Sequence, residues 1–232
     1  MLRNTSTLII TFLAIFFSSC GNSSKNGDKE TAKVSDTTAT SAAAATAANK
    51  KKILFFGTSL TAGLGLEDPN EAYPNLIQQK IDAINLPYHV VNAGLSGETS
   101  AAGKSRIGWV LKQPISIFVL ELGANDGLRG VSVSETTRNL QSIIDTVKNK
   151  YPEAKMVLAG MQIPPNMGEK YASDFKDMFK QLAVKNKMTF VPFLLEGVGG
   201  IPALNQNDGI HPTAEGQKIL AKNVWVKLKE IL

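Results

Sequence analysis

A serine, a histidine and an aspartate stand in patterns that could build a nucleophilic site. His211 lies in the segment Asp208-Gly209-Ile210-His211-Pro212, three residues after a carboxylate. Asp208 can accept the proton of one ring nitrogen, which leaves the other nitrogen to take a proton from a serine. Ser59 follows the apolar run Ile53–Phe56 and stands where the chain turns toward a helix. Because a histidine base turns a serine hydroxyl into a nucleophile, these residues predict attack on a carbonyl carbon.

Two further positions could stabilise the negative oxygen that forms in such an attack. Asn125 lies in a Gly-x-Asn-Asp turn after another apolar run, and its side-chain NH₂ could donate to that oxygen. Gly97 could bring its backbone N–H to the same point, since it has no side chain in the way. With the backbone N–H of Ser59, these groups are three candidate donors of an oxyanion hole.

Several of these residues also have structural interpretations. Ser59 could simply cap the helix that follows it. The other histidine, His89, lies in an apolar run where we expect a half-buried structural residue. The segment from Gly97 to Ser105 resembles a phosphate-binding loop, but Glu98 stands where the spacing demands glycine, which argues against nucleotide binding. No Gly-x-Ser-x-Gly occurs in the chain, so the nucleophile elbow of the α/β-hydrolase fold is absent.

Apolar runs alternate with helical periodicities along the chain. The runs have the composition of strands buried on both faces of a parallel sheet and lie at residues 53–56, 88–91, 115–120, 156–159 and 188–193. The periodicities lie at 73–84, at 140–147 after a capping-box pattern formed by Ser132 and Glu135, and at 213–231. Right-handed crossovers predict an α/β fold with helices on both faces of a parallel sheet. The chemical motifs would then meet at the carboxyl ends of the strands.

Four of these motifs together resemble the SGNH hydrolases, also called the GDSL esterases, which are named for one Ser, Gly, Asn and His. The four are Ser59 in Gly57–Leu60, Gly97 in Asn92–Thr99, Asn125 in Glu121–Gly130 and His211 in Asp208–Pro212. The longer strings are most similar to the bacterial periplasmic thioesterase, lysophospholipase and arylesterase branch. The resemblance implies a three-layer α/β/α, flavodoxin-like fold with a five-stranded parallel sheet.

The resemblance also implies a substrate groove and shows one departure. A shallow acyl groove would be bordered by the loops after the third and fourth strands, near Leu128, Pro165 and Met167, although these three could equally be packing residues. The family's Asp before the nucleophile is Thr58 here. That aspartate positions the turn and is no part of the triad, so we interpret the change as tolerated.

The predicted reaction is two-step transfer of an acyl group from an ester or thioester to water, through an acyl-enzyme on Ser59. No cofactor is needed, and two histidines without a cysteine pair predict no metal site. Two alternatives stay open. A carbohydrate acetylesterase would use the same residues on a small acyl group, and a surface-binding lipoprotein disabled at Thr58 would not catalyse at all.

The first fifty residues differ from the rest of the chain. Residues 1–20 have a positive start, an apolar stretch and the Ser18-Ser19-Cys20 junction, which is typical of a bacterial lipoprotein signal, and we expect lipidation of Cys20. An ordinary cleaved signal with an incidental Cys20 is the alternative. Residues 21–50 are rich in Ser, Thr and Ala and are expected to form a disordered tether, followed by one hydrolase domain over 51–232.

These features together predict where the protein acts. We expect a monomer that is exported and anchored to a membrane of the bacterial cell envelope, on its periplasmic or surface side, through Cys20. The net charge is +5, but many of the lysines lie in or beside the tether, so no nucleic-acid partner is expected. The expected partner is the acyl ester or thioester substrate.

Overall fold

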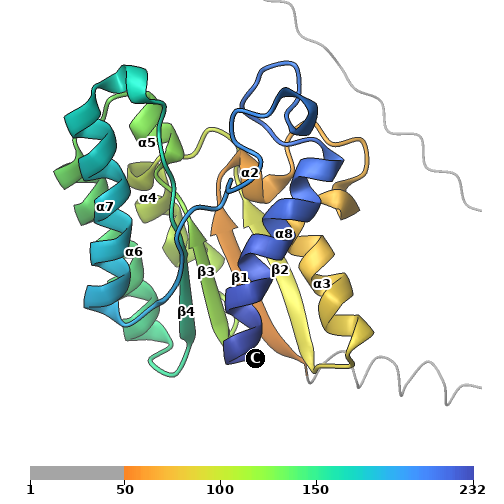
Figure 1. Cartoon of the computed structure of the whole chain (residues 1–232). Helices are drawn as coiled ribbons and strands as arrows, with labels where there is room; N and C mark the ends of the chain where they lie inside the picture. Colours follow the sequence, from red (N-terminus) through yellow and green to blue (C-terminus); the bar gives the residue numbers. More distant parts are fainter. Residues whose placement is uncertain (1–49) are drawn as a thin grey trace, which may run out of the picture.

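The fold centres on a five-stranded parallel sheet with the strand order β2-β1-β3-β4-β5 (Figure 1). The structure is a computed structural model that describes residues 50–232. Its strands are β1 Lys51–Gly57, β2 Tyr88–Gly94, β3 Ile117–Glu121, β4 Lys155–Ala159 and β5 Thr189–Val191. Every neighbouring pair is parallel, which confirms the predicted sheet. The signal, the tether and Cys20 lie outside the described residues.

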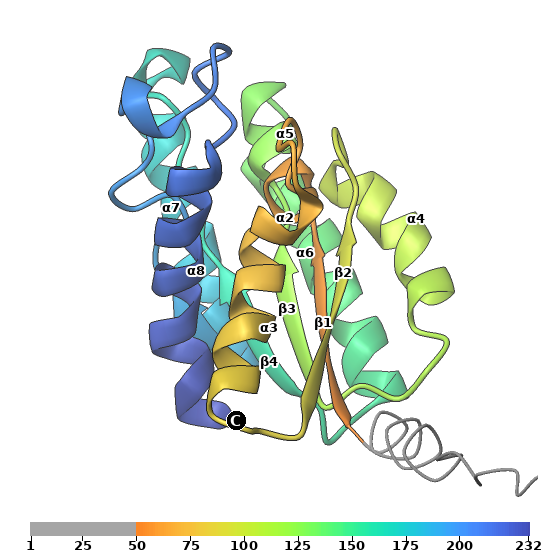
Figure 2. The ribbon, with the colours of Figure 1, turned by 90° about the vertical axis from the view of Figure 1, so that its right-hand side faces the viewer.

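Helices cover both faces of the sheet, so the fold has the three predicted layers (Figures 1 and 2). The helices are α2 Ser59–Ala62, α3 Tyr73–Ala83, α4 Ser100–Val110, α5 Ala124–Leu128, α6 Val133–Lys150, α7 Glu169–Asn186 and α8 Ala214–Leu228. Within residues 50–232 there are also four short 3₁₀ turns: η1 Pro69–Glu71, η2 Pro165–Met167, η3 Pro202–Leu204 and η4 Lys229–Ile231. Helices α3 and α8 pack together on one face, while α4, α6 and α7 pack on the other.

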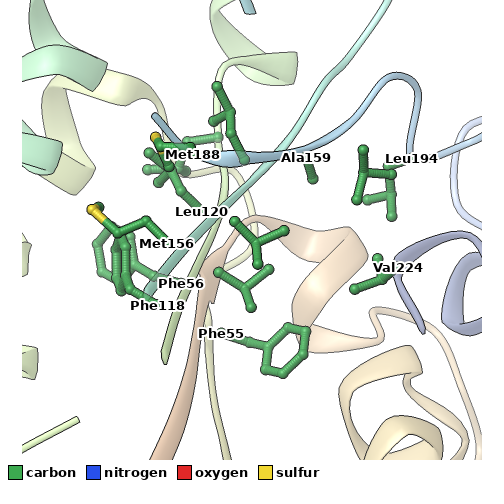
Figure 3. Packing of buried hydrophobic residues seen from close by; sticks show 14 of the residues in the cluster. Phe55, Phe56, Phe118, Leu120, Met156, Ala159, Met188, Leu194 and Val224 are labelled. Carbon is green, nitrogen blue, oxygen red and sulfur yellow. The ribbon is translucent and has the colours of Figure 1, made fainter. Parts of the chain in front are cut away.

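The central strands are apolar because both of their faces are covered. Successive side chains of a strand point to opposite faces. In β1, the ring of Phe55 packs edge-on against Tyr73 of α3, while Phe56 faces the other layer and lies beside Phe118 of β3 (Figure 3). All four of these aromatic side chains are fully buried. The strand therefore contributes to two hydrophobic layers at once.

Three details refine the sequence predictions. Helices α4 and α7 were not predicted, whereas the cap of α6 was, because Ser132 accepts from the backbone N–H of Glu135. His89 is exposed rather than half-buried, since β2 is an edge strand whose side chains alternate between buried and exposed positions. Within residues 50–232, no helix combines the length and the apolar character needed to span a membrane.

Candidate active site

The structure brings together the serine, histidine and aspartate that the sequence singled out. Ser59 Oγ lies 2.9 Å from His211 Nε2, and His211 Nδ1 lies 2.6 Å from Asp208 Oδ2. Ser59 and His211 are separated by 152 residues in the chain. The side chain of Asp208 is 45% exposed, while Ser59 as a whole is 8% exposed. The arrangement is a continuous hydrogen-bond chain from a shielded hydroxyl through the imidazole to a solvated carboxylate.

Asp208 is held as an anion by the loop that carries it. Besides the contact with the imidazole, its Oδ1 accepts from the backbone N–H groups of Ile210 at 2.9 Å and His211 at 3.0 Å. The hydrogen bond from the His211 ring, followed by those from the two backbone groups, holds the pKa of Asp208 well below its usual range. Asp208 can therefore fix the imidazole with a proton on Nδ1, which leaves Nε2 facing Ser59 as the base.

Two loops at the carboxyl edge of the sheet present these groups. Strand β1 ends at Gly57, and Thr58 caps α2, whose first residue is Ser59. The histidine lies in the loop before α8, where the backbone N–H of Gln206 donates to the carbonyl of His211 at 2.7 Å. Thr213 then caps α8 by accepting from the N–H of Gly216. Ser59 thus begins a helix without being its cap, which leaves its hydroxyl for His211.

The candidate oxyanion donors lie at the starts of α2 and α5 and in the loop after β2, and the last two are joined by hydrogen bonds. Asn125 and Ser59 line the same cavity, and Asn125 Nδ2 donates to the carbonyl of Glu98 at 3.1 Å. Gly97 has a φ of 78°, a conformation that favours glycine, and its carbonyl accepts from Arg129 at 3.3 Å. Gly97 is not among the residues that line the cavity, so the structure groups Asn125 with Ser59 more directly than Gly97.

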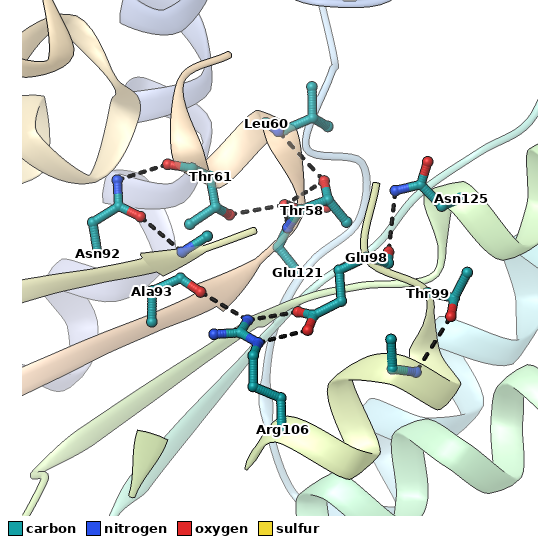
Figure 4. A network of polar contacts seen from close by, with 12 residues as sticks. Thr58, Leu60, Thr61, Asn92, Ala93, Glu98, Thr99, Arg106, Glu121 and Asn125 are labelled. Atoms are coloured by element: carbon teal, nitrogen blue, oxygen red, sulfur yellow. Dashed lines mark hydrogen bonds and ion pairs between the residues drawn. The ribbon is translucent and has the colours of Figure 1, made fainter. Parts of the chain in front are cut away.

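An ion pair that the sequence analysis did not predict supports this loop. The buried carboxylate of Glu98 accepts from Arg106 Nε at 2.6 Å and Nη2 at 2.5 Å. Arg106 also donates to the carbonyl of Ala93 at 2.9 Å (Figure 4). Its guanidinium lies 4.2 Å from the centre of the Phe56 ring. Bidentate pairing fixes the positions of the Glu98 and Arg106 side chains, so it stabilises the loop that carries Gly97. A partial signal was present, since a carboxylate stands at position 98, where a phosphate-binding loop would require glycine.

A second buried carboxylate lies behind the nucleophile. Glu121 is fully buried at the end of β3 and accepts from the backbone N–H of Thr58 at 2.9 Å. It also accepts from the hydroxyls of Thr58 at 3.0 Å and Thr61 at 2.8 Å. Burial raises the pKa of Glu121 to about 7, against the opposing effect of these hydrogen bonds. No role was predicted for Glu121 from the sequence, although an acid that closes an apolar strand run is itself unusual.

A mainly apolar cavity opens beside the triad. Its volume is about 500 Å³. Its wall includes Ser59 and His211 together with the apolar residues Leu128, Met161, Ile163, Phe193, Leu195 and Ile210. The predicted groove residue Leu128 is therefore in the wall. Met167 is partly buried against the hydrophobic core and is not among the lining residues, and Pro165 begins η2 next to the lining residue Pro164.

The three-layer fold and the serine–histidine–aspartate site define a hydrolase of the SGNH type. The chain matches the GDSL-like lipase/acylhydrolase family over residues 55–219. It belongs to this family and is a carboxylic ester hydrolase.

Among its relatives, the chain is 40% identical to Esterase TesA of Pseudomonas aeruginosa over 181 residues, which cover 78% of this chain and 89% of that protein. It is 36% identical to Thioesterase 1/protease 1/lysophospholipase L1 of Escherichia coli K12 over 170 residues, 73% of this chain and 79% of that protein. A crystal structure of TesA superimposes with a TM-score of 0.75 at 39% identity and covers 78% of this chain and 100% of that one. These matches confirm the family and the branch that the motifs predicted.

Proposed function

We propose that this protein hydrolyses esters or thioesters of acyl chains through an acyl-enzyme on Ser59. The main support is the series of hydrogen bonds from Ser59 through His211 to Asp208, with Ser59 and His211 in the wall of an apolar cavity. His211 Nε2 takes the proton of Ser59 as Oγ attacks the carbonyl carbon, and it then returns the proton to the leaving alcohol or thiol. A water molecule, deprotonated by the same nitrogen, releases the acid from Ser59.

The cavity supports an acyl chain as the group that is bound. Its apolar wall begins at the nucleophile. An acyl chain attached to the reacting carbonyl would therefore move from water into apolar surroundings when the substrate binds. The names of the relatives, an esterase and a thioesterase/lysophospholipase, agree with such a substrate. Asn125 and the backbone N–H groups of Ser59 and Gly97 are the proposed donors to the oxyanion.

Single and double substitutions of the triad test this mechanism. Ser59→Ala and His211→Ala should each lower kcat on a p-nitrophenyl ester by about a thousandfold or more. The double variant should lose little more than either single one, because the two residues act as one unit. A fluorophosphonate probe should label Ser59 in the wild type and leave Ser59→Ala unlabelled. Near-normal turnover of Ser59→Ala would place the nucleophile elsewhere, and a wild type that neither turns over nor labels would be a binding protein.

An acyl-chain-length series tests the substrate class. Phe193 is half-buried in the cavity wall, so Phe193→Ala should lower kcat/KM for medium-chain esters by about tenfold, about 1.4 kcal/mol, through lost apolar contact. The acetyl ester, whose acyl group has a single methyl beyond the carbonyl and little apolar surface to bury, should serve as the internal control and change little. If the acetyl ester is instead the best substrate and responds as strongly as the longer chains, the enzyme is an acetylesterase.

We also propose that residues 1–20 direct export and that Cys20 carries the lipid anchor. The support is the sequence alone: a short apolar stretch ends at the single cysteine, and a Ser/Thr/Ala-rich segment follows. The enzyme would then act at the cell envelope, held by its acyl chains. Intact-mass analysis of membrane-fraction protein should show an acylated Cys20 at the N-terminus. An unmodified product that begins after Cys20 would contradict the anchor without affecting the proposed chemistry.

A further inference from the structure

The hydrogen bonds around Glu121 connect one buried side chain to three elements. Its carboxylate closes β3, and it accepts from Thr58, the cap of α2, and from Thr61 inside that helix (Figure 4). The Thr61 hydroxyl in turn contacts the hydroxyl of Tyr73 on α3 at 2.8 Å. Ser59 lies between the two threonines that Glu121 holds. The position of the nucleophile is therefore set by residues that all have a hydrogen bond to one carboxylate.

The donors around Glu121 match a carboxylate better than a carboxylic acid. The N–H of Thr58 can only donate, and Thr61 has one hydroxyl proton to donate from Oγ1, which lies 2.8 Å from Glu121 Oε2. The Thr58 hydroxyl lies 3.0 Å from both carboxylate oxygens. A proton on Glu121 would face these donors, and at least one threonine hydroxyl would have to turn away from it. Protonation would thus loosen the turn that presents Ser59.

The backbone at Gly57 lies close to the Glu121 carboxylate. A Cβ atom at Gly57 would lie 2.1 Å from Thr61 Oγ1 and 2.6 Å from Glu121 Oε2, so only glycine leaves room for the carboxylate at the end of β1. Within residues 50–232, Glu121 forms no ion pair, and the only other titratable side chain in its contact chain is Tyr73. The charge is therefore balanced by hydrogen bonds alone, a costly arrangement that is typical of functional sites.

From these contacts we infer that Glu121 is a positioning residue for the nucleophile and that hydrolysis requires it as a carboxylate. This role of Glu121 rests on the proposed function of Ser59. It adds a second group that must be deprotonated for hydrolysis. His211 must be neutral to act as the base, and Glu121 must be ionised to hold the Thr58–Thr61 turn. Burial raises the pKa of Glu121 to about 7, so this carboxylate takes up a proton as the pH falls below neutrality. Activity should decline on the acid side through two protons rather than one.

The pH profile of kcat/KM tests the inference. For the wild type, the acid limb should be steeper than one decade per pH unit below about pH 7, because Glu121 takes up a proton there in addition to the proton that inactivates the base. Glu121→Gln keeps the shape but removes the charge and places an NH₂ group against the donors. It should lower kcat by about tenfold or more with a small change in KM, as misplacement of a nucleophile does. Its acid limb should have the slope of one proton.

A second variant guards against a simple folding defect. Thr61→Val removes a hydrogen bond that lowers the pKa of Glu121, so its acid limb should move to higher pH while its slope stays that of two protons. Glu153→Gln, at an exposed glutamate in a turn, is the matched control and should keep the wild-type profile. Wild-type kcat and slope in Glu121→Gln, or an unmoved limb in Thr61→Val, would overturn the inference. Fluorophosphonate labelling of Ser59 in the same samples separates that result from failure of the proposed function, which would leave the wild type unlabelled.

Discussion

Thr58 and Ser59 are neighbours with separate tasks. The hydroxyl of Thr58 lies 3.0 Å from both oxygens of Glu121 and accepts weakly from the N–H of Leu60 at 3.4 Å, so it supports the turn that presents Ser59. The family's aspartate at this position would set a second carboxylate beside Glu121. Two such groups in a buried site share a proton, which raises the pKa of the pair.

Thr58→Asp should therefore change kcat by about tenfold at most at pH 8 and move the acid limb to higher pH. The measurement is kcat against pH for the variant and the wild type on the same ester. A natural protein that is inert and becomes active in Thr58→Asp would show that Thr58 disables it.

At the same scale, the sequence predicted residues whose motifs are local and missed residues whose partners are distant. His211 and Asp208 are three positions apart, and Ser59 follows a strand directly, so their order and spacing were informative. Glu121 meets Thr58 across 63 residues, and no periodicity connects them. Glu98 was noted only as a mismatch to a phosphate-binding loop, because its pairing with Arg106 depends on how α4 packs.

At the scale of elements, the close approach of β2 to α2 sets where Ser59 lies. A Cβ atom on Gly94 would lie 2.3 Å from the backbone nitrogen of Ala62, which cannot move without shifting the helix of the nucleophile. Gly108 on α4 has open space around its missing side chain. The two glycines therefore make a matched pair of substitutions.

Gly94→Ala should destabilise the fold by about 2 kcal/mol or more, through overpacking, and should lower kcat as well. Gly108→Ala should stabilise it by roughly 0.5–1 kcal/mol, the helix propensity difference, with kcat unchanged. Chemical denaturation and steady-state kinetics on both variants provide the measurements. Equal effects of the two substitutions would mean that the contact at Ala62 is not rigid.

The elements themselves were predictable where their hydrophobic pattern was strong. Strand β3 is buried at all five positions, and its first four residues, Ile117 to Leu120, form a continuous apolar run. Helix α4 was missed because it buries little besides Ser100, Gly103 and Ile107, which leaves no apolar stripe. Helix α7 did carry a signal, since Phe175, Phe179 and Leu182 are spaced by four and three residues and are buried.

For the whole molecule, Glu121 couples stability to pH in the opposite direction from an ordinary carboxylate. Its pKa rises from 4.5 to about 7 in the fold, so between these values the folded protein keeps a proton that the unfolded chain has lost. The free energy of unfolding therefore falls as pH rises through this window. The difference corresponds to about 3 kcal/mol at 1.36 kcal/mol per pKa unit.

Glu121→Gln removes this dependence. As the pH rises from 5 to 8, the free energy of unfolding of the variant should increase by about 3 kcal/mol relative to that of the wild type. The variant nevertheless has the lower activity over this range. Urea denaturation at several pH values checks the expectation, with Glu153→Gln as the control. A constant difference between variant and wild type across that range would show that Glu121 is ionised throughout, at its ordinary pKa.

The parallel sheet also decides which side of the molecule is free for attachment. Strand β1 begins at the edge opposite Ser59, and α8 returns to that edge, where the carbonyl of Ile231 accepts from Lys155 at the start of β4. The starts of β1 and β4 are two strand spacings apart, about 10 Å. A short peptide could join the two ends of the domain, and new termini could be opened elsewhere. A fusion partner or a solid support coupled at either end of the domain would lie on the side opposite Ser59. The cavity beside Ser59 would then remain accessible to the substrate.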